Sequence, residues 1–141
     1  MRIIEKNGKR EVYDPVRKKY VALTPEEGVR QFVIEFLQGR CGIPAGYISV
    51  ERGLRVYRNF FRTDLQVRNR RNVPALLVEC KRPSVPLDEQ VLEQAMRYHI
   101  ATQERFVVIT NGGDFKCYER FAEGWRERER YPDWQELNAI L

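Results

Sequence analysis

The stretch Pro74–Lys81 constrains the fold of this chain more than any other segment. It reads Pro-Ala-Leu-Leu-Val-Glu-Cys-Lys and is apolar on both faces until Glu79. A strand of this kind is usually central in a sheet that is covered on both sides. Because side chains alternate along a strand, Glu79 and Lys81 point to one side and Cys80 points to the other. The sequence therefore predicts a buried strand that ends with an acid and a base together.

Asp64 belongs to the strand predicted just before this one, which should pair with it as a hairpin through the polar turn 68–72. Asp64 comes opposite Glu79 and Lys81 only if the two strands pair with an offset or a bend. With that offset, two acids and a lysine converge on one sheet edge, where oxygen ligands suit Mg²⁺. The alternatives are a buried ion pair between Glu79 and Lys81, or a simple exit of the strand to solvent.

The remaining pattern predicts an α/β domain. Thr24 caps a helix that begins at Pro25 and runs to about Gln38, and Glu27 is placed for a capping box. Its buried stripe is expected to contain Val29, Phe32, Val33, Phe36 and Leu37. A first strand is expected near 47–57, a second helix over 87–101, a parallel strand over 106–110 and a last strand over 115–121. The helix over 87–101 is then a crossover between parallel strands.

Two extensions flank the core, which we place at residues 24–121 of a single domain spanning 1–141. Asn7-Gly8 lies between short apolar segments and predicts an N-terminal hairpin within residues 1–23. Residues 122–141 are expected to form a C-terminal helical tail. The fold class is thus a mixed sheet flanked by helices, in the order helix, three strands, helix, strand (αβββαβ).

Composition bounds the partners and the compartment. The net charge of +5 slightly favours a polyanionic partner. Three widely spaced cysteines, Cys41, Cys80 and Cys117, argue against a disulfide framework and favour a reducing cytoplasm. No window approaches the ~20 apolar residues of a membrane span. The sequence has a single histidine, His99, which is too few for a histidine-rich zinc site and gives little support to a histidine-paired nucleophile. A structural role is therefore expected for His99.

The order Asp64, then Glu79-Cys80-Lys81, resembles the PD-(D/E)xK nuclease superfamily. Residues 14–121 more specifically resemble the N-terminal nuclease domain of type I restriction enzyme R subunits. The matching residues are Asp14–Val21, Thr24–Glu27, Val29–Gln31, Arg62–Asp64, Leu77–Lys81, Gln94, Tyr98 and Thr110–Gly112. Thr63 and Gly28 depart from the pattern, and neither is among the expected metal ligands.

This resemblance implies a Mg²⁺- or Mn²⁺-dependent site. Asp64, Glu79 and the backbone carbonyl of Cys80 would hold the metal, and Lys81 would orient the attacking water. Gln94, the further catalytic residue expected, and Tyr98 are one helical turn apart and would lie near the catalytic centre, where they would contact DNA or steady the metal-bound acids. Otherwise they would simply form a polar helix edge. Glu27 is either a further ligand or only a cap. The expected nucleic-acid contacts are Tyr98, Arg30, Gln31, Arg68, Arg70, Arg71 and the run Arg17-Lys18-Lys19, although the arginines and lysines are equally explained as surface charges.

The function implied is that of a hydrolase: a cytoplasmic, magnesium-dependent restriction-modification endonuclease that binds DNA and cleaves its phosphodiester bonds. The motor ATPase that accompanies the resembled domain has no motif here, so a motor or another restriction subunit would act in trans. The alternative is a nuclease fold that serves as a non-catalytic nucleic-acid-binding or assembly module. A homodimer is compatible with the sequence, which does not fix the oligomeric state.

Overall fold

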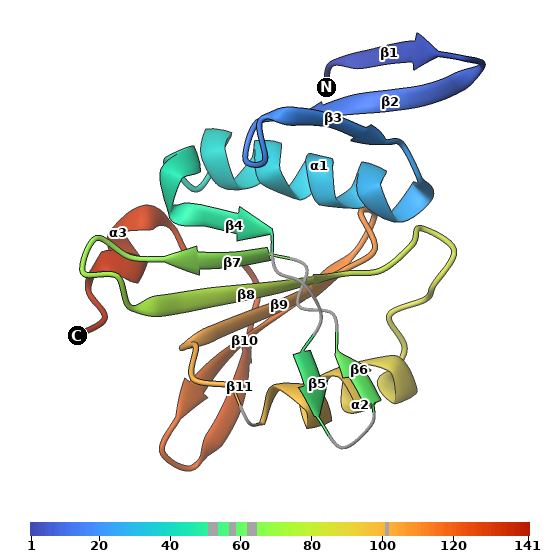
Figure 1. Ribbon diagram of the computed structural model, residues 1–141. Coiled ribbons are helices and arrows are strands. Elements are labelled where there is room, and N and C mark those ends of the chain that lie inside the picture. The colour runs from blue at the N-terminus through green and yellow to red at the C-terminus, as the bar shows by residue number, and fades with distance from the viewer. Residues whose placement is uncertain (51–53, 57–58, 62–64, 101) are drawn as a thin grey trace.

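The fold is built around a six-stranded mixed sheet with helices on both sides (Figure 1). The computed structural model describes residues 1–50, 54–56, 59–61, 65–100 and 102–141. The sheet has the order β11-β10-β9-β8-β7-β4, and only β8 and β9 are parallel neighbours. Its strands are β4 (Ile48–Val50), β7 (Leu65–Arg68), β8 (Pro74–Cys80), β9 (Phe106–Thr110), β10 (Phe115–Phe121) and β11 (Gly124–Arg128). The predicted mixed α/β class is confirmed.

Strand β8 is buried on both faces, as its apolar run predicts. Leu76 and Val78 pack with α1 (Pro25–Gly39) and α3 (Trp134–Asn138) in one core, while Leu77 packs with α2 (Glu89–His99) in another. Helix α2 is the predicted crossover between β8 and β9, although it begins after Asp88 and ends at His99. Glu79 follows the alternation of Leu77 and therefore lies on the side of the sheet that α2 covers.

Helix α1 begins at Pro25 after the predicted cap, since the Thr24 hydroxyl accepts a hydrogen bond from the Glu27 amide at 3.0 Å. Its buried face is rotated from the predicted stripe: Ile34 is buried, whereas Phe32 is 49% exposed. The reason is that the flank carrying Glu27 is also covered, by Arg17 from the N-terminal sheet. Apolar periodicity alone could not include a buried polar flank.

The N-terminal region forms a separate three-stranded sheet of β1 (Ile3–Lys6), β2 (Lys9–Asp14) and β3 (Lys19–Ala22), which lies beside α1 (Figure 1). The hairpin predicted at Asn7-Gly8 is confirmed, with both residues at positive φ, +52° and +77°. The third strand was not predicted, and it completes this sheet by pairing with β2.

Two expected elements differ in the structure. The single strand expected over 47–57 is replaced by β4 and by β5 (Leu54–Val56), which pairs with β6 (Asn59–Phe61) in a sheet of its own. A local hairpin with a two-residue connection competes well with a long strand. The bend expected at Gly53 lies outside the described residues. The expected helical tail is helical only in α3, because the charged stretch before it pairs with β10 as β11.

Cys41, Cys80 and Cys117 are all buried, and they form no disulfide with one another. Within the described part of the chain, no helix combines the length and apolar character that a membrane crossing requires.

Asn69 holds the turn between β7 and β8 against the end of the chain. Its buried amide donates to the carbonyls of Leu137 and Ile140, each at 3.1 Å, and its side-chain oxygen accepts from the amides of Arg71 and Val73. Because one side chain satisfies four backbone groups, its loss leaves several of them without partners.

Replacing Asn69 with alanine is expected to lower the free energy of unfolding by about 2–3 kcal/mol. Urea denaturation followed by circular dichroism measures the change. The matched control is Arg71→Ala, which removes an exposed side chain from the same turn and should leave stability nearly unchanged. Equal stabilities of the two variants would show that Asn69 does not hold the turn.

Candidate active site at the end of strand β8

Glu79 and Lys81 meet at the carboxyl end of β8. The Glu79 side chain is buried, with the residue only 7% exposed, and its Oε2 lies 2.8 Å from the Lys81 Nζ. The Lys81 side chain is 34% exposed, and its backbone amide donates to the Thr110 carbonyl of β9 at 2.7 Å. The strand thus leaves the sheet at Lys81, where a buried carboxylate and a solvent-reaching ammonium group are held together.

His99 completes the surroundings of Glu79 and was not predicted to do so. Its Nε2 lies 3.0 Å from Glu79 Oε1, and the imidazole is buried with the residue 2% exposed. His99 is the last residue of α2, one turn after the buried Ala95. The helical spacing of Leu92, Ala95 and His99 places the histidine on the face that covers β8 and β9, and this spacing is the signal that could have found it.

These contacts keep Glu79 ionised. Burial opposes the charged form, but the hydrogen bonds from His99 and Lys81, together with the charges of these groups, hold the pKa of Glu79 below its ordinary value. Among the described residues, each oxygen of the carboxylate has one such contact, and a carboxylate has about four lone-pair positions in all. Glu79 therefore retains acceptor capacity for a further ligand.

The lowered pKa of Glu79 predicts a pH dependence of stability. A carboxylate with a depressed folded-state pKa stabilises the fold fully above its ordinary pKa of about 4.5, and this contribution is lost as the pH falls through the folded-state pKa. In Glu79→Gln, the free energy of unfolding is therefore expected to decrease less steeply than in the wild type as the pH falls below about 4.5. Urea denaturation of both proteins between about pH 3 and pH 7 measures it. Parallel pH profiles would contradict the assignment.

Asp64, the second expected carboxylate, lies outside the described residues, and so do Arg62 and Thr63. The described ends of the two strands nevertheless run together, because Leu65 pairs with Val78 in the antiparallel β7–β8 ladder. Leu65 directly follows Asp64 in the chain, and Val78 directly precedes Glu79. The ladder also contains a register shift between Val67 and Arg68. The position of Asp64 relative to Glu79 stays a prediction.

The other residues expected around this centre are placed as follows. The Cys80 side chain is buried in the core on the other side of the sheet, as alternation predicts. Gln94 is exposed on α2 and lies one turn before Tyr98, whose side chain is outside the described part of the structure. Within the described residues, no group of three or more His, Cys, Asp and Glu side chains is arranged to hold a metal ion.

Glu27 occupies a different cluster, in which both oxygens of its carboxylate accept from nitrogen donors. Glu27 Oε1 accepts from Arg17 Nη2 at 2.7 Å and from Arg30 Nη1 at 2.6 Å, while Oε2 accepts from Gln31 Nε2 at 3.2 Å. Glu27 therefore binds arginine rather than completing the predicted capping box. Arg30 and Gln31 are buried in these contacts, and the expected contact of these two residues with nucleic acid stays a prediction.

Arg17 ties this cluster to Asp14, which is also buried. Burial opposes ionisation of Asp14, but hydrogen bonds from the Arg17 side chain and from the Arg17 and Val16 amides hold its pKa below the ordinary value. Arg17 thus joins the N-terminal sheet to α1, and it is not the free surface charge that the run Arg17-Lys18-Lys19 suggested.

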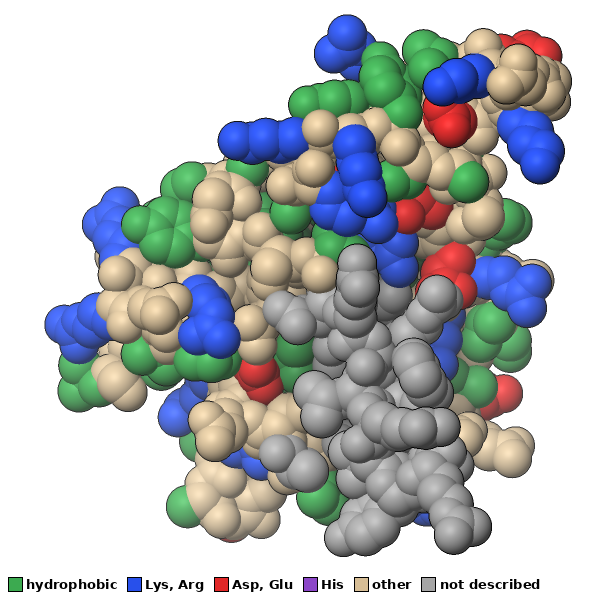
Figure 2. Space-filling model, in the orientation of Figure 1, with side chains coloured by type: hydrophobic (Ala, Val, Ile, Leu, Met, Phe, Trp, Pro, Cys, Tyr) green, Lys and Arg blue, Asp and Glu red, His purple; other side chains and the backbone are tan. Residues whose placement is uncertain are grey.

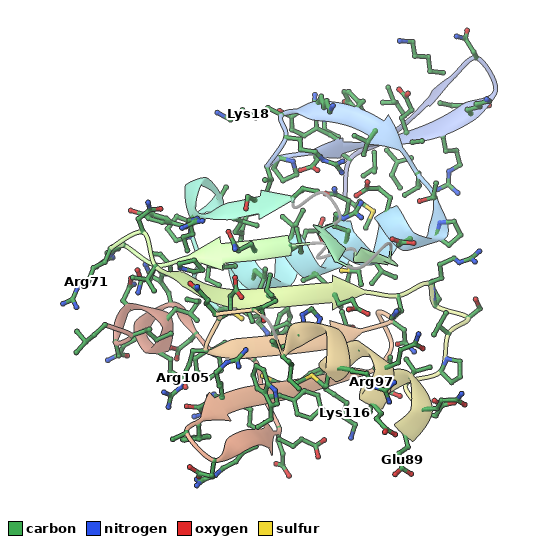
Figure 3. All side chains as sticks on the ribbon, turned by 60° about the horizontal axis from the view of Figure 1, so that its bottom comes forward. Lys18, Arg71, Glu89, Arg97, Arg105 and Lys116 are labelled. Carbon is green, nitrogen blue, oxygen red and sulfur yellow. The ribbon has the colours of Figure 1, made fainter. Side chains whose placement is uncertain are left out.

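The arginines of the β7–β8 turn lie at the opposite end of β8 from Glu79. Arg68 donates to the Asn72 carbonyl, Arg70 stacks over the Trp134 ring at 5.7 Å, and Arg71 points outward. Figure 3 shows Arg71 at one end of the molecule and α2 with Lys116 toward the other. Figure 2 shows Lys and Arg side chains on several separate parts of one face, including the N-terminal sheet and this turn. Phosphate contacts by these arginines stay a prediction.

The described fold and site define a class: a mixed α/β domain with an acid and a lysine at the carboxyl end of a central strand. The model of the family "Type I restriction enzyme R protein N terminus" matches residues 25–130. The chain belongs to this family.

A solved structure has the same fold. It is a fragment of a protein described as an HsdR subunit of a type I restriction enzyme from Vibrio vulnificus YJ016, with a TM-score of 0.59 and 21% sequence identity. The alignment covers 82% of this chain and 24% of that chain. This chain therefore matches about a quarter of the length of that solved fragment. The comparison with curated protein sequences found no match.

Proposed function

We propose that this chain is a divalent-metal-dependent nuclease of the PD-(D/E)xK type that hydrolyses phosphodiester bonds in DNA. The observation that carries the proposal is the 2.8 Å pair of Glu79 and Lys81 at the end of a buried strand of a type I R protein N-terminal fold. A buried acid at the end of an apolar strand costs folding free energy, so its retention beside a lysine is more readily explained by chemistry.

The donor chemistry fits Mg²⁺ or Mn²⁺. Glu79 is ionised and keeps lone pairs for a hard cation, and Asp64 and the Cys80 carbonyl are the further oxygen ligands that we propose. Such a cation supplies Lewis-acid stabilisation of the negative charge that develops on the phosphate. Lys81, with its ammonium group at the protein surface, would orient the attacking water and stabilise the phosphate oxygens in the transition state.

The biological setting proposed is restriction. The related solved protein is described as a subunit of a type I restriction enzyme. By this relation we propose that the chain acts on DNA together with other restriction subunits, and that a motor ATPase works in the same assembly. Gln94 and Tyr98 on α2, and the arginines of the β7–β8 turn, are the proposed contacts to DNA.

Cleavage of supercoiled plasmid in the presence of Mg²⁺ tests the proposal. The wild-type protein is expected to nick or linearise the plasmid, and Asp64→Ala and Glu79→Ala are expected to reduce the rate by about 10²-fold or more, as loss of a group essential to the chemistry does. Circular dichroism checks that both variants remain folded. Undiminished cleavage by both variants, or cleavage that persists in excess EDTA, would refute the assignment.

A further inference from the structure

His99 is a polar residue that the proposed reaction leaves without a task. The residue is 2% exposed, and its Nε2 lies 3.0 Å from Glu79 Oε1. Within the described part of the chain, Nδ1 has no hydrogen-bond partner. Burying an imidazole costs stability unless its polar atoms are paired, and here Nε2 is paired with the carboxylate of the candidate site.

The backbone of His99 is anchored from the far side of α2. Its carbonyl accepts from Arg120 Nη2 at 3.1 Å and from the Thr102 hydroxyl at 2.7 Å. The Arg120 guanidinium also donates to the Thr102 carbonyl at 2.7 Å and lies over the Trp125 ring at 4.2 Å from its centroid. A cation at the carboxyl end of a helix satisfies the last carbonyls. The end of α2, and with it the imidazole, is therefore fixed to β10 and β11.

Lys81 and His99 contact different oxygens of the Glu79 carboxylate. Lys81 approaches Oε2 and His99 approaches Oε1, so the carboxylate is held from two directions. Lys81 is partly exposed and its side chain has several rotatable bonds, whereas the imidazole is buried on an anchored helix end. The orientation of the carboxylate plane is thus set mainly by His99.

We propose that His99 is a positioning residue that donates a hydrogen bond from Nε2 to Glu79 and so orients this carboxylate toward the divalent cation. The inference rests on the proposed function. It assigns the hydrogen-bond donor to Nε2 and gives His99 no direct contact with substrate or metal. Groups that orient a metal-binding carboxylate in this way typically change metal affinity or activity 10- to 100-fold when they are removed.

The test measures Mn²⁺ binding to the folded protein by calorimetry without DNA, alongside plasmid cleavage. His99→Leu is expected to weaken Mn²⁺ binding about 10- to 100-fold and to lower kcat, whereas His99→Gln, whose amide donates from a similar position, should restore most of both. Leu92→Ala is the matched control, because it removes packing from the same face of α2 in the neighbouring core cluster. It should reduce thermal stability and leave Mn²⁺ affinity unchanged.

A metal-free measurement examines the hydrogen bond itself. The ¹⁵N chemical shifts of the His99 ring in wild-type protein are expected to show the proton on Nε2, and a proton on Nδ1 alone would overturn the inference. Wild-type Mn²⁺ affinity in His99→Leu, with binding lost in Glu79→Ala, would overturn it while leaving the proposed function standing. Absence of Mn²⁺ binding and of cleavage in the wild-type protein would instead refute the proposed function, and the positioning role with it.

Discussion

Replacing Lys81 with methionine is expected to lower the rate of DNA cleavage by about 10²- to 10³-fold, which corresponds to about 2.7–4 kcal/mol of transition-state stabilisation. Methionine keeps much of the length and apolar stem of lysine but removes the ammonium group that lies 2.8 Å from Glu79. Because the Lys81 side chain is partly exposed and Glu79 keeps its contact with His99, the fold should survive the change. Initial rates of plasmid nicking at saturating Mg²⁺ provide the measurement.

Lys116→Met is the matched control for this prediction. Lys116 is a comparably exposed lysine on β10, two strands across the sheet from Glu79, and its Nζ lies 3.0 Å from the Oε1 of a different and exposed carboxylate, Glu127. Its replacement removes the same charge from the same protein and should leave the cleavage rate close to that of the wild type. If the two variants cleave alike, Lys81 acts only through the net charge of the protein.

The central part of the fold could be predicted because its signals are local and strong. The apolar run of β8, the cap at Thr24 and the Asn7-Gly8 turn each fix one element by short-range chemistry, and the crossover through α2 follows from the parallel strands. The β5–β6 hairpin and β11 were missed for the opposite reason. The segments of β5 and β6 are very short, and β11 is highly charged and forms a strand by pairing with β10, which its own sequence does not reveal.

The candidate site divides in the same way. Alternation along β8 was enough to place Glu79 and Lys81 on one side, and the structure shows them in contact. The role of His99 depends on which face of α2 covers β8. That face is set by tertiary packing, which the sequence pattern alone did not identify. Glu27 shows the converse difficulty. The local pattern favoured a cap or a metal ligand for Glu27. In the structure, however, its carboxylate accepts a hydrogen bond from Arg17, ten residues earlier, and sequence spacing does not predict this contact.

Replacing Glu27 with alanine is expected to lower the free energy of unfolding by about 3–5 kcal/mol, since it leaves the buried Arg30 and the partly buried Arg17 without their shared carboxylate. Glu27→Gln keeps a hydrogen-bond acceptor and should lose less. The control is Glu35→Ala on the same helix, where a 53% exposed carboxylate pairs with the amino terminus and contributes less than about 1 kcal/mol. Urea denaturation of all three variants measures the losses.

The same experiment separates the two roles considered for Glu27. A buried partner of two arginines stabilises the protein equally with and without divalent cations, whereas a metal ligand would contribute more when Mg²⁺ is bound to the folded state. The loss caused by Glu27→Ala is therefore expected to be the same in Mg²⁺ and in EDTA, because the described contacts engage both Glu27 oxygens with nitrogen donors. A loss that appears only with Mg²⁺ would place Glu27 in the metal site. It would also require Arg17 and Arg30 to release its carboxylate when the metal binds.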